Sequence, residues 1–410
     1  MRKLKIDKRR YILIMLIIFL AILAIFFPSF KHITNAENVA EDELSQEEIL
    51  QEIEDELGNQ LDNLDMSSIE NLLDSLTDEE LALFGEKGFL DKITSLLSGE
   101  ISQGSSLWTS ILEIFFDSLL EIIPFISIII AVALLGNLIQ GLKPTKSEKS
   151  ISNLIHFVTY GIIVVIVLSI VVKMITMTTN TIFTIKNQMD AIFPLLLTLL
   201  TAVGGTVSVS VYQPAMALLT SVIINLFTYV LMPLFIFSII FSVVSNLSNT
   251  IKLDKFTSFF NSTFKWITGL IFTIFTAFLS IQGITAGSID GISIKTAKYA
   301  IKSYVPILGS YISDGMGVIL ASSNLIKNAV GASGLFLLLA SIITPILQLV
   351  LFMLALKLVS AIIEPLGSKQ IANFVSSLSK NMTLLIVTIV GIAFASFITI
   401  GLVMCSANIF

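Results

Sequence analysis

Three apolar helix pairs, each marked by a proline, follow one another along this chain and constrain its fold more than any other feature. Pro124, Pro233 and Pro345 lie about 110 residues apart, and each begins an apolar stretch that a short lysine-bearing segment separates from a second apolar run. Internal repetition of this kind sets an architecture before single elements are assigned. We therefore interpret the chain as three weak parallel repeats of helix pairs.

The composition indicates a membrane protein. Hydrophobic residues make up 55% of the chain and charged residues 13%, with a mean hydropathy of +0.91. A soluble core of this length needs far less apolar surface. We expect an all-α polytopic membrane protein with about six to eight transmembrane helices, two broken or re-entrant segments and a small acidic helical ectodomain.

Residues 1–36 are predicted to be a signal peptide or an N-terminal anchor. Six Lys or Arg residues among the first ten precede the apolar run 11–27. A basic flank stays in the cytoplasm, so the chain after this run is expected to emerge outside. Because the run is long for a signal peptide and short for a transmembrane helix, the sequence leaves cleavage open.

Residues 37–104 are predicted to form an acidic, helical, extracytoplasmic region. Between positions 37 and 100 there are 20 Asp and Glu residues against two Lys residues, and Leu or Ile recurs every three to four positions. This spacing is typical of amphipathic helices. Thr77 followed by three acids predicts a helix start. The region is either a solvated linker or a docking surface for a partner.

The polytopic domain, residues 105–410, contains six apolar runs long enough to cross a bilayer. They are 107–139, 151–172, 215–244, 266–282, 335–363 and 382–403, grouped into repeats of about 107–175, 191–284 and 303–407. The three runs that contain a repeat proline exceed the length needed to cross. We expect these three helices to be bent or split at the proline.

Two further apolar segments, 191–213 and 303–324, are interrupted by glycines and lie at matching positions in the second and third repeats. This pattern is typical of re-entrant or discontinuous helices that line a cavity, although the segments could also span. The candidate pore or gate residues are Gly204, Gly205, Asp314, Gly315 and Gly317. The carboxylate of Asp314 is predicted to bind a cation or to act as a helix N-cap.

Lysine placement predicts the orientation of the chain. If both broken segments enter and leave by one face, the lysines at 143–149, 252–255 and 369 share the other face. The positive-inside bias makes that face cytoplasmic.

Charged side chains in or beside the apolar runs are the remaining site candidates. Glu113, Asp117 and Glu121 are spaced four apart, so they share one helix face. This possible charged face is either part of a proton or cation path or lies in water at the membrane interface. Asp290 is interpreted as a turn residue. Lys327, with Asn328, is interpreted as an interfacial anchor, the alternatives being that it holds a lipid phosphate or pairs with Asp314.

No enzyme signature is present. The chain has one cysteine, two histidines and none of the nucleotide-binding, zinc-protease or hydrolase motifs. Its three arginines all lie within the first ten residues, so nothing resembles a clamp for phosphates or nucleic acid. We expect no catalytic activity, no cofactor, no metal and no nucleic-acid partner.

Five motifs in the polytopic domain resemble the stage III sporulation protein AE family. They are FTAFLSIQG at 275–283, ISIKTAKY at 292–299, VPILGSYISDGMG at 305–317, LIKNAVGASG at 325–334 and EPLGSKQI at 364–371. The resemblance covers most of 107–410, whereas the first hundred residues match only in layout.

The resemblance implies a protein of an endospore-forming bacterium, placed in the mother-cell membrane around the forespore. It implies partners from the stage III operon, namely a cytoplasmic ATPase and ring-forming membrane proteins, and a forespore protein across the intermembrane space. The implied function is a channel or export-gate component of a secretion (feeding-tube) complex, needed for late forespore development. No catalytic residues come with the family. An autonomous secondary transporter and a membrane scaffold that recruits the ring proteins are the alternatives.

Overall fold

The computed structural model describes residues 66–85, 88–98, 104–141, 149–247, 253–304, 309–366 and 369–406. Within these ranges the regular structure is entirely helical and contains no strand. Six of the helices are long and apolar enough to cross a membrane. The expectation of an all-α polytopic membrane protein is confirmed, whereas residues 1–36 and most of the acidic region before Met66 lie outside the described residues.

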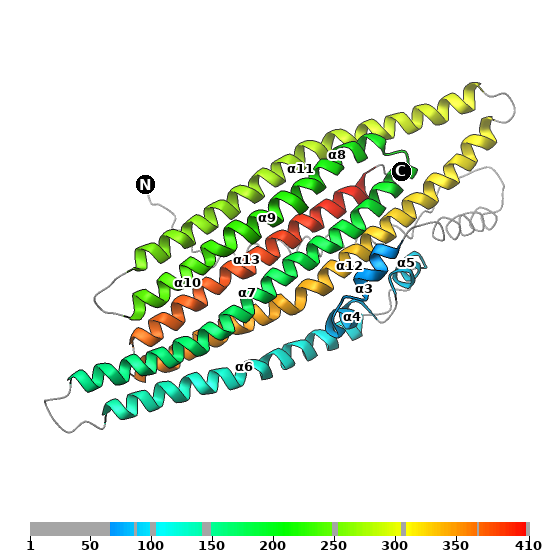
Figure 1. The fold of residues 1–410 in the computed structure, drawn as a ribbon. Coiled ribbons are helices and arrows are strands. Elements are labelled where there is room, and N and C mark those ends of the chain that lie inside the picture. Colours follow the sequence, from blue (N-terminus) through cyan, green and yellow to red (C-terminus); the bar gives the residue numbers. More distant parts are fainter. Residues whose placement is uncertain are drawn as a thin grey trace, which may run out of the picture.

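Long helices build the bundle in Figure 1. They are α6 (Gly104–Gly141), α7 (Lys149–Ala202), α11 (Asp254–Tyr304), α12 (Gly309–Ile363) with the 3-10 turn η4 (Glu364–Leu366), and α13 (Lys369–Cys405). Between α7 and α11 one composite helix runs through α8 (Thr206–Ala217), the π-helical η2 (Leu218–Ile223), α9 (Ile224–Leu226), the π-helical η3 (Phe227–Leu231) and α10 (Met232–Leu247).

The long helices pair as the three repeats predict. The connections α6–α7, α10–α11 and α12–α13 all lie at one end of the bundle, which we call the hairpin end (Figure 1). The connections α7–α8 and α11–α12 lie at the opposite, distal end, together with the C-terminal end of α13 (Figure 1). Of the lysines that predict a cytoplasmic face, Lys149, Lys255 and Lys369 lie in the first turns of α7, α11 and α13, at the hairpin end.

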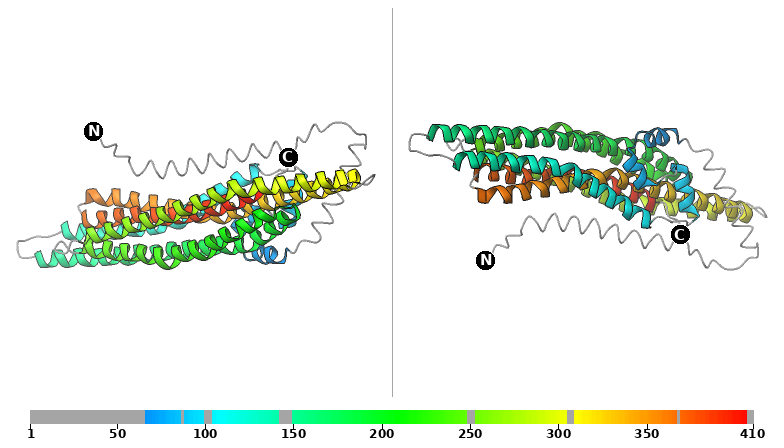
Figure 2. Two further views of the ribbon diagram at one scale, coloured as in Figure 1. Left: turned by 90° about the horizontal axis from the view of Figure 1, so that it is seen from above. Right: turned by 90° about the horizontal axis from the view of Figure 1, so that it is seen from below.

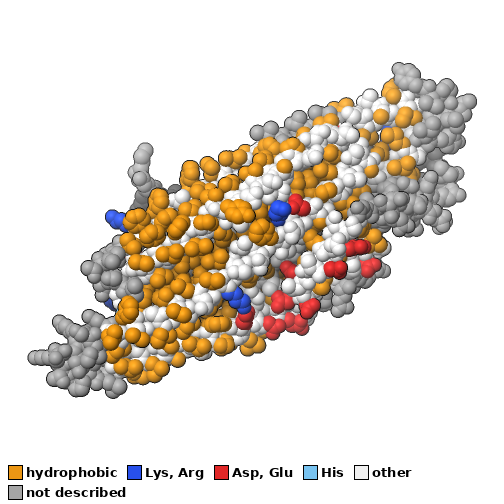
Figure 3. All heavy atoms as spheres, in the orientation of Figure 1, with side chains coloured by type: hydrophobic (Ala, Val, Ile, Leu, Met, Phe, Trp, Pro, Cys, Tyr) orange, Lys and Arg blue, Asp and Glu red, His pale blue; other side chains and the backbone are white. Residues whose placement is uncertain are grey.

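These helices are much longer than a bilayer requires. The 54 residues of α7 span about 80 Å at 1.5 Å per residue, whereas a hydrocarbon core is about 30 Å thick. Exposed apolar side chains gather toward the hairpin end, and the acidic side chains on the face in Figure 3 lie from the middle of the bundle onward. The distal half of the bundle therefore extends beyond a membrane placed around the hairpin half.

Helix α13 occupies the centre of the bundle. In the most apolar stretch of α13, 72% of the residues are buried. The corresponding share is 22% in α6 and 28% in α11. It packs against α7, α10, α11 and α12. A helix therefore fills the centre of the described bundle.

The repeat prolines differ in their effect on the helices. Pro124 and Pro345 lie inside the unbroken helices α6 and α12 and do not split them, whereas Pro233 lies at the start of α10, directly after the π-helical η3. Segment 191–213 is broken at Gly204 and Gly205, as predicted, and comprises the end of α7, a tight turn and the start of α8. Segment 303–324 likewise contains the end of α11 and the start of α12.

The described part of the acidic region forms three short helices, α3 (Ser67–Leu73), α4 (Asp78–Phe84) and α5 (Phe89–Leu97), beside the distal half of the bundle (Figure 1). Thr77 caps α4 in a capping box with Glu80, as predicted. Phe84 and Phe89 are buried, and Nζ of Lys92 lies 4.9 Å from the ring centre of Phe336 in α12. These helices therefore pack on the bundle.

Candidate functional site

The turn between α7 and α8 contains two of the predicted gate residues. Gly204 adopts a φ of 85°, in the left-handed region that favours glycine. Its N–H donates to the carbonyl of Thr201 at 2.9 Å, and the N–H of Gly205 donates to that of Leu200 at 2.8 Å. This pair of bonds is the Schellman arrangement that ends helices, so both glycines serve a tight helix reversal.

Asp290 holds the start of α8 from a neighbouring helix. Its carboxylate accepts from the N–H groups of Val207 at 3.0 Å and Ser208 at 2.8 Å, and its residue is only 1% exposed. Asp290 lies within α11, so its interpretation as a turn residue is wrong. A carboxylate at this position satisfies free N–H groups and favours the positive end of the helix dipole.

Lys327 is the matching cation at the end of another helix. It is fully buried, and its Nζ donates to the backbone carbonyl of Ser406, just after the end of α13. The hydroxyl of Ser406 donates to the Tyr212 hydroxyl of α8 at 2.8 Å. A cation favours the negative, C-terminal end of a helix. The prediction that Lys327 is an interfacial anchor is therefore wrong, because its side chain is buried between helices.

We call Asp290, Val207, Ser208, Tyr212, Ser406 and Lys327 the helix-end cluster. It connects α8, α11, α12 and α13 at the distal end of the bundle. Both of its charged residues are buried and are satisfied by backbone groups at helix ends. Isolated buried charges are costly, so such a cluster is stable only while these four helices keep their present positions.

The second broken segment meets the same region of α11. A Cβ placed on Gly204 would lie 3.0 Å from Cγ1 of Ile294, and one on Gly317 would lie 3.6 Å from Nζ of Lys298. Ile294 and Lys298 are one turn apart on α11, and Asp290 is one turn before them. Helix α11 thus contacts both segments that the sequence predicts as gate elements.

The remaining predicted gate residues lie in the first turns of α12. Because this helix begins at Gly309, Asp314 lies inside it and is not its N-cap residue. A Cβ on Gly315 would meet nothing within 4 Å, so no close contact there requires glycine. The predicted pore or gate residues are therefore divided between the α7–α8 turn and the first turns of α12.

The predicted charged face of α6 is exposed. Glu113, Asp117 and Glu121 lie on one side of the helix, as their spacing predicts, and Glu121 pairs with Lys173 of α7. Both partners of this pair are about half exposed. Among the described residues, no three His, Cys, Asp or Glu side chains are grouped closely enough to hold a metal ion.

A second polar cluster joins three helices near the hairpin end. Ser238 of α10 donates to Asn261 of α11 at 2.8 Å, and Asn261 donates to Asn381 of α13 at 2.8 Å. Asn381 in turn donates to Ser238 at 3.3 Å, which closes the triangle. Such interhelical hydrogen bonds hold membrane helices together where lipid offers no alternative partner.

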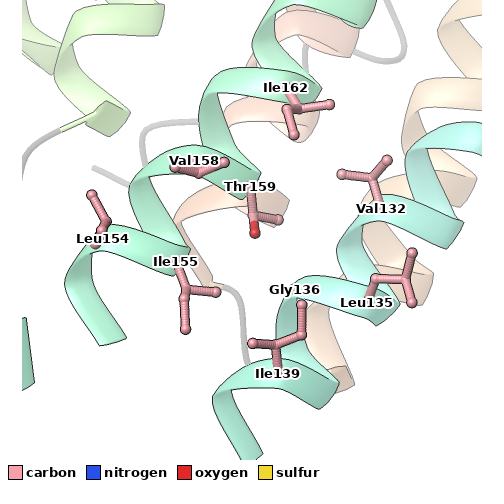
Figure 4. Close-up of a pocket in the computed structure, with 9 residues that line it drawn as sticks. All are labelled: Val132, Leu135, Gly136, Ile139, Leu154, Ile155, Val158, Thr159 and Ile162. Atoms are coloured by element: carbon pink, nitrogen blue, oxygen red, sulfur yellow. The ribbon is translucent and has the colours of Figure 1, made fainter. Parts of the chain in front are cut away.

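An open groove of about 350 Å³ separates α6 from α7 at the hairpin end (Figure 4). Its lining is apolar except for Thr159, and it faces the same side as other exposed apolar side chains. A Cβ on Gly136 would lie 2.4 Å from Oγ1 of Thr159, so glycine is what lets the two helices approach here. Apart from Thr159, the lining residues offer no polar side chain that would select a solute.

The sequence comparisons agree with the motifs in the polytopic domain. The family described as stage III sporulation protein AE matches residues 89–407. Stage III sporulation protein AE of Bacillus subtilis (strain 168) is 24% identical over 272 residues, which cover 66% of this chain and 68% of that protein. No solved structure matches. This chain therefore belongs to the stage III sporulation protein AE family.

Proposed function

We propose that this protein is the multi-pass channel or export-gate component of the complex that connects the mother cell with the forespore. It acts from the mother-cell membrane around the forespore and is required for late forespore development. Family membership supports the sporulation role, and six candidate spans support a place within the membrane.

The helix-end cluster is the observation that carries the gate proposal. The cluster contains two buried charges of opposite sign, Asp290 on α11 and Lys327 on α12. Helix α11 contacts both broken segments, 191–213 and 303–324. Moving α8 away from α13 would separate Tyr212 from Ser406 and open the site around Lys327 to water. A few hydrogen bonds of the helix-end cluster hold the distal ends of these helices together. If these bonds break, the bundle can change from a closed to an open state.

Because α13 fills the centre of the described bundle, the proposed passage does not run through a single closed chain. It forms when the distal ends separate, or it lies between this chain and the ring-forming partners. The acidic helices α3–α5 stand beside the same distal half, where a ring in the intermembrane space would meet them (Figure 2). In this proposal the cytoplasmic ATPase acts at the hairpin end.

The test is a strain that lacks only this gene, examined through engulfment with a fluorescent reporter of late forespore transcription. We expect engulfed forespores that shrink and leave the reporter dark, with recovery when the intact gene is returned. Cysteines placed at Gly204 and Gly317 are expected to cross-link to ring proteins. Normal sporulation in the deletion strain would refute the proposal.

An autonomous secondary transporter is the second candidate, because buried charges in a membrane bundle are common in substrate and ion sites. Asp290 and Lys327 are such charges. This candidate predicts gradient-driven uptake by the purified protein in liposomes, which persists when residues 37–104 are deleted. The gate proposal predicts no uptake without partners.

A further inference from the structure

A row of polar and cationic side chains runs along the outer face of α13 at the hairpin end. Lys369, Asn373 and Lys380 are exposed, and Ser376 between them is half-buried. The rest of α13 is largely buried, so this row is where its first three turns reach the surface. It begins at the end that the lysine bias assigns to the cytoplasm.

Lys357 of α12 borders the same row. Met353, one turn before it, accepts from the hydroxyl of Ser379 through its carbonyl and contacts Thr383 through its sulfur. These two α13 residues flank Lys380. Since Lys357 is exposed and one turn from that contact, it lies on the same α12–α13 seam. We call Lys357, Lys369 and Lys380 with Asn373 and Ser376 the lysine seam.

At the level of the seam along the bundle axis, the opposite side of the bundle, formed by α7, is apolar. Phe374 of α13 packs against Tyr160 of α7, with ring centres 5.6 Å apart, and both helices run from the hairpin end toward the distal end. Lys380 is six residues beyond Phe374 and therefore lies level with about Ile166. Ile166 is in the middle of the run 154–172, which contains no Asp, Glu, Lys or Arg.

At this end α12 and α13 lie on one side of the bundle, and α7 and α10 lie on the other (Figure 2). The α7 side exposes large apolar residues such as Phe157 and Val165, as a lipid-facing surface does. On the seam side, Leu354, Leu358 and Ile362 of α12 are exposed around Lys357. The lysines are thus set within a surface that otherwise suits acyl chains.

The seam lysines have no acidic partner within the described chain. The ion pairs Lys173–Glu121 and Lys186–Asp190 lie elsewhere, and among the described residues the exposed acid nearest the seam along the chain, Glu364 of η4, pairs with none of the seam lysines. An ammonium group held at membrane depth without a counter-charge is costly. The seam therefore presents positive charge that no described acid neutralises, and this charge can attract an anion.

We propose that the lysine seam binds the phosphate headgroup of an anionic phospholipid. Lys357 and Lys380 provide the positive charge, Asn373 and Ser376 provide hydrogen-bond donors, and the exposed leucines of α12 contact an acyl chain. The adjoining apolar surface favours a lipid over an acidic segment of a soluble protein, which would leave Leu354, Leu358 and Ile362 uncovered. Basic clusters between helices on the cytoplasmic side are suited to such headgroups.

The test measures lipid binding to the full-length protein by native mass spectrometry in detergent. The probes are phosphatidylglycerol and phosphatidylcholine with matched acyl chains, and inorganic phosphate serves as the competitor. We expect phosphatidylglycerol to bind more tightly, and the double variant K357Q/K380Q to lose about 25-fold in affinity, at about fivefold per lysine. The double variant K357R/K380R retains binding.

The matched control is K295Q/K302Q, which removes the same charge from exposed lysines at the distal end of α11 and should leave binding unchanged. All these lysines are exposed, so the variants should fold. Equal binding of both lipids, or an equal loss in the control, would overturn the proposal. So would full displacement by inorganic phosphate, which would identify a site for free anions. Loss of a co-purifying membrane protein with unchanged lipid binding would assign the seam to that partner instead.

Discussion

Replacing Asp290 with alanine tests directly whether one carboxylate fixes the start of α8. The change removes the acceptor of two N–H groups, bound at 3.0 Å from Val207 and 2.8 Å from Ser208. Loss of a capping side chain costs about 0.5–2 kcal/mol, and an unsatisfied buried N–H costs about 1–3 kcal/mol. Because Ser208 is fully buried, water cannot replace the carboxylate without a local opening. The sum is about 3 kcal/mol.

The assay is amide hydrogen exchange of the purified protein. A loss of about 3 kcal/mol corresponds to an exchange rate about 100-fold faster at Val207 and Ser208, since about 1.4 kcal/mol is a factor of ten. The variant D290N keeps one acceptor oxygen, so it should give a smaller increase, about tenfold.

The control is D190A, which removes an acid from a partly exposed pair on α7 with Lys186. It should leave exchange at the start of α8 unchanged, because i,i+4 pairs contribute only about 0.2–0.5 kcal/mol. Unchanged exchange at Val207 and Ser208 in folded D290A would refute the reasoning. A uniform increase over all helices would also refute it, because Asp290 would then support the whole bundle and not one helix end.

Three further variants test other contacts. In K327M the last turn of α13 loses its cationic partner, so a nitroxide label on Cys405, the single cysteine, should become more mobile in its EPR spectrum. G204A places a Cβ in the left-handed region and should lower the thermal midpoint by about 2 °C, whereas G315A, which meets no neighbour, should not lower it. N381L breaks the polar triangle between α10, α11 and α13 and should cost about 1–2 kcal/mol in denaturant unfolding; an unchanged midpoint would show that lipid-facing packing alone holds these helices.

The sequence predicts the membrane part of the fold because the signal there is local. Apolar runs of sufficient length identify all six spans, and the capping sequence after Thr77 places the start of α4. The ends of the long helices are harder to predict. In α7 the polar stretch after Lys173 ends the apolar run, but the helix continues to Ala202 because other helices cover it. Hydropathy detects the membrane boundary and not the helix end.

The helix-end cluster could not be derived from the sequence because its partners are far apart along the chain. Asp290 binds backbone groups 82 and 83 residues before it, and Lys327 binds a carbonyl 79 residues after it. Backbone groups leave no residue-type signal that would mark them as partners. The glycine pair at Gly204 and Gly205 marks the break in the sequence, but the structure assigns it to a helix reversal, which requires a local left-handed residue. Tyr212 could not be identified either, because it lies in an apolar segment with no motif around it.

The proposed passage between mother cell and forespore is tested most directly by photobleaching a small fluorescent dye in engulfed forespores. In cells with the intact gene, the account predicts that forespore fluorescence recovers from the mother cell. Fluorescence should fail to recover in cells that lack the gene. In cells that carry K327M at normal protein abundance, the rate of recovery should differ from that in cells with the intact gene. Equal recovery in all three strains would contradict the account, because it would show that small molecules pass without this protein.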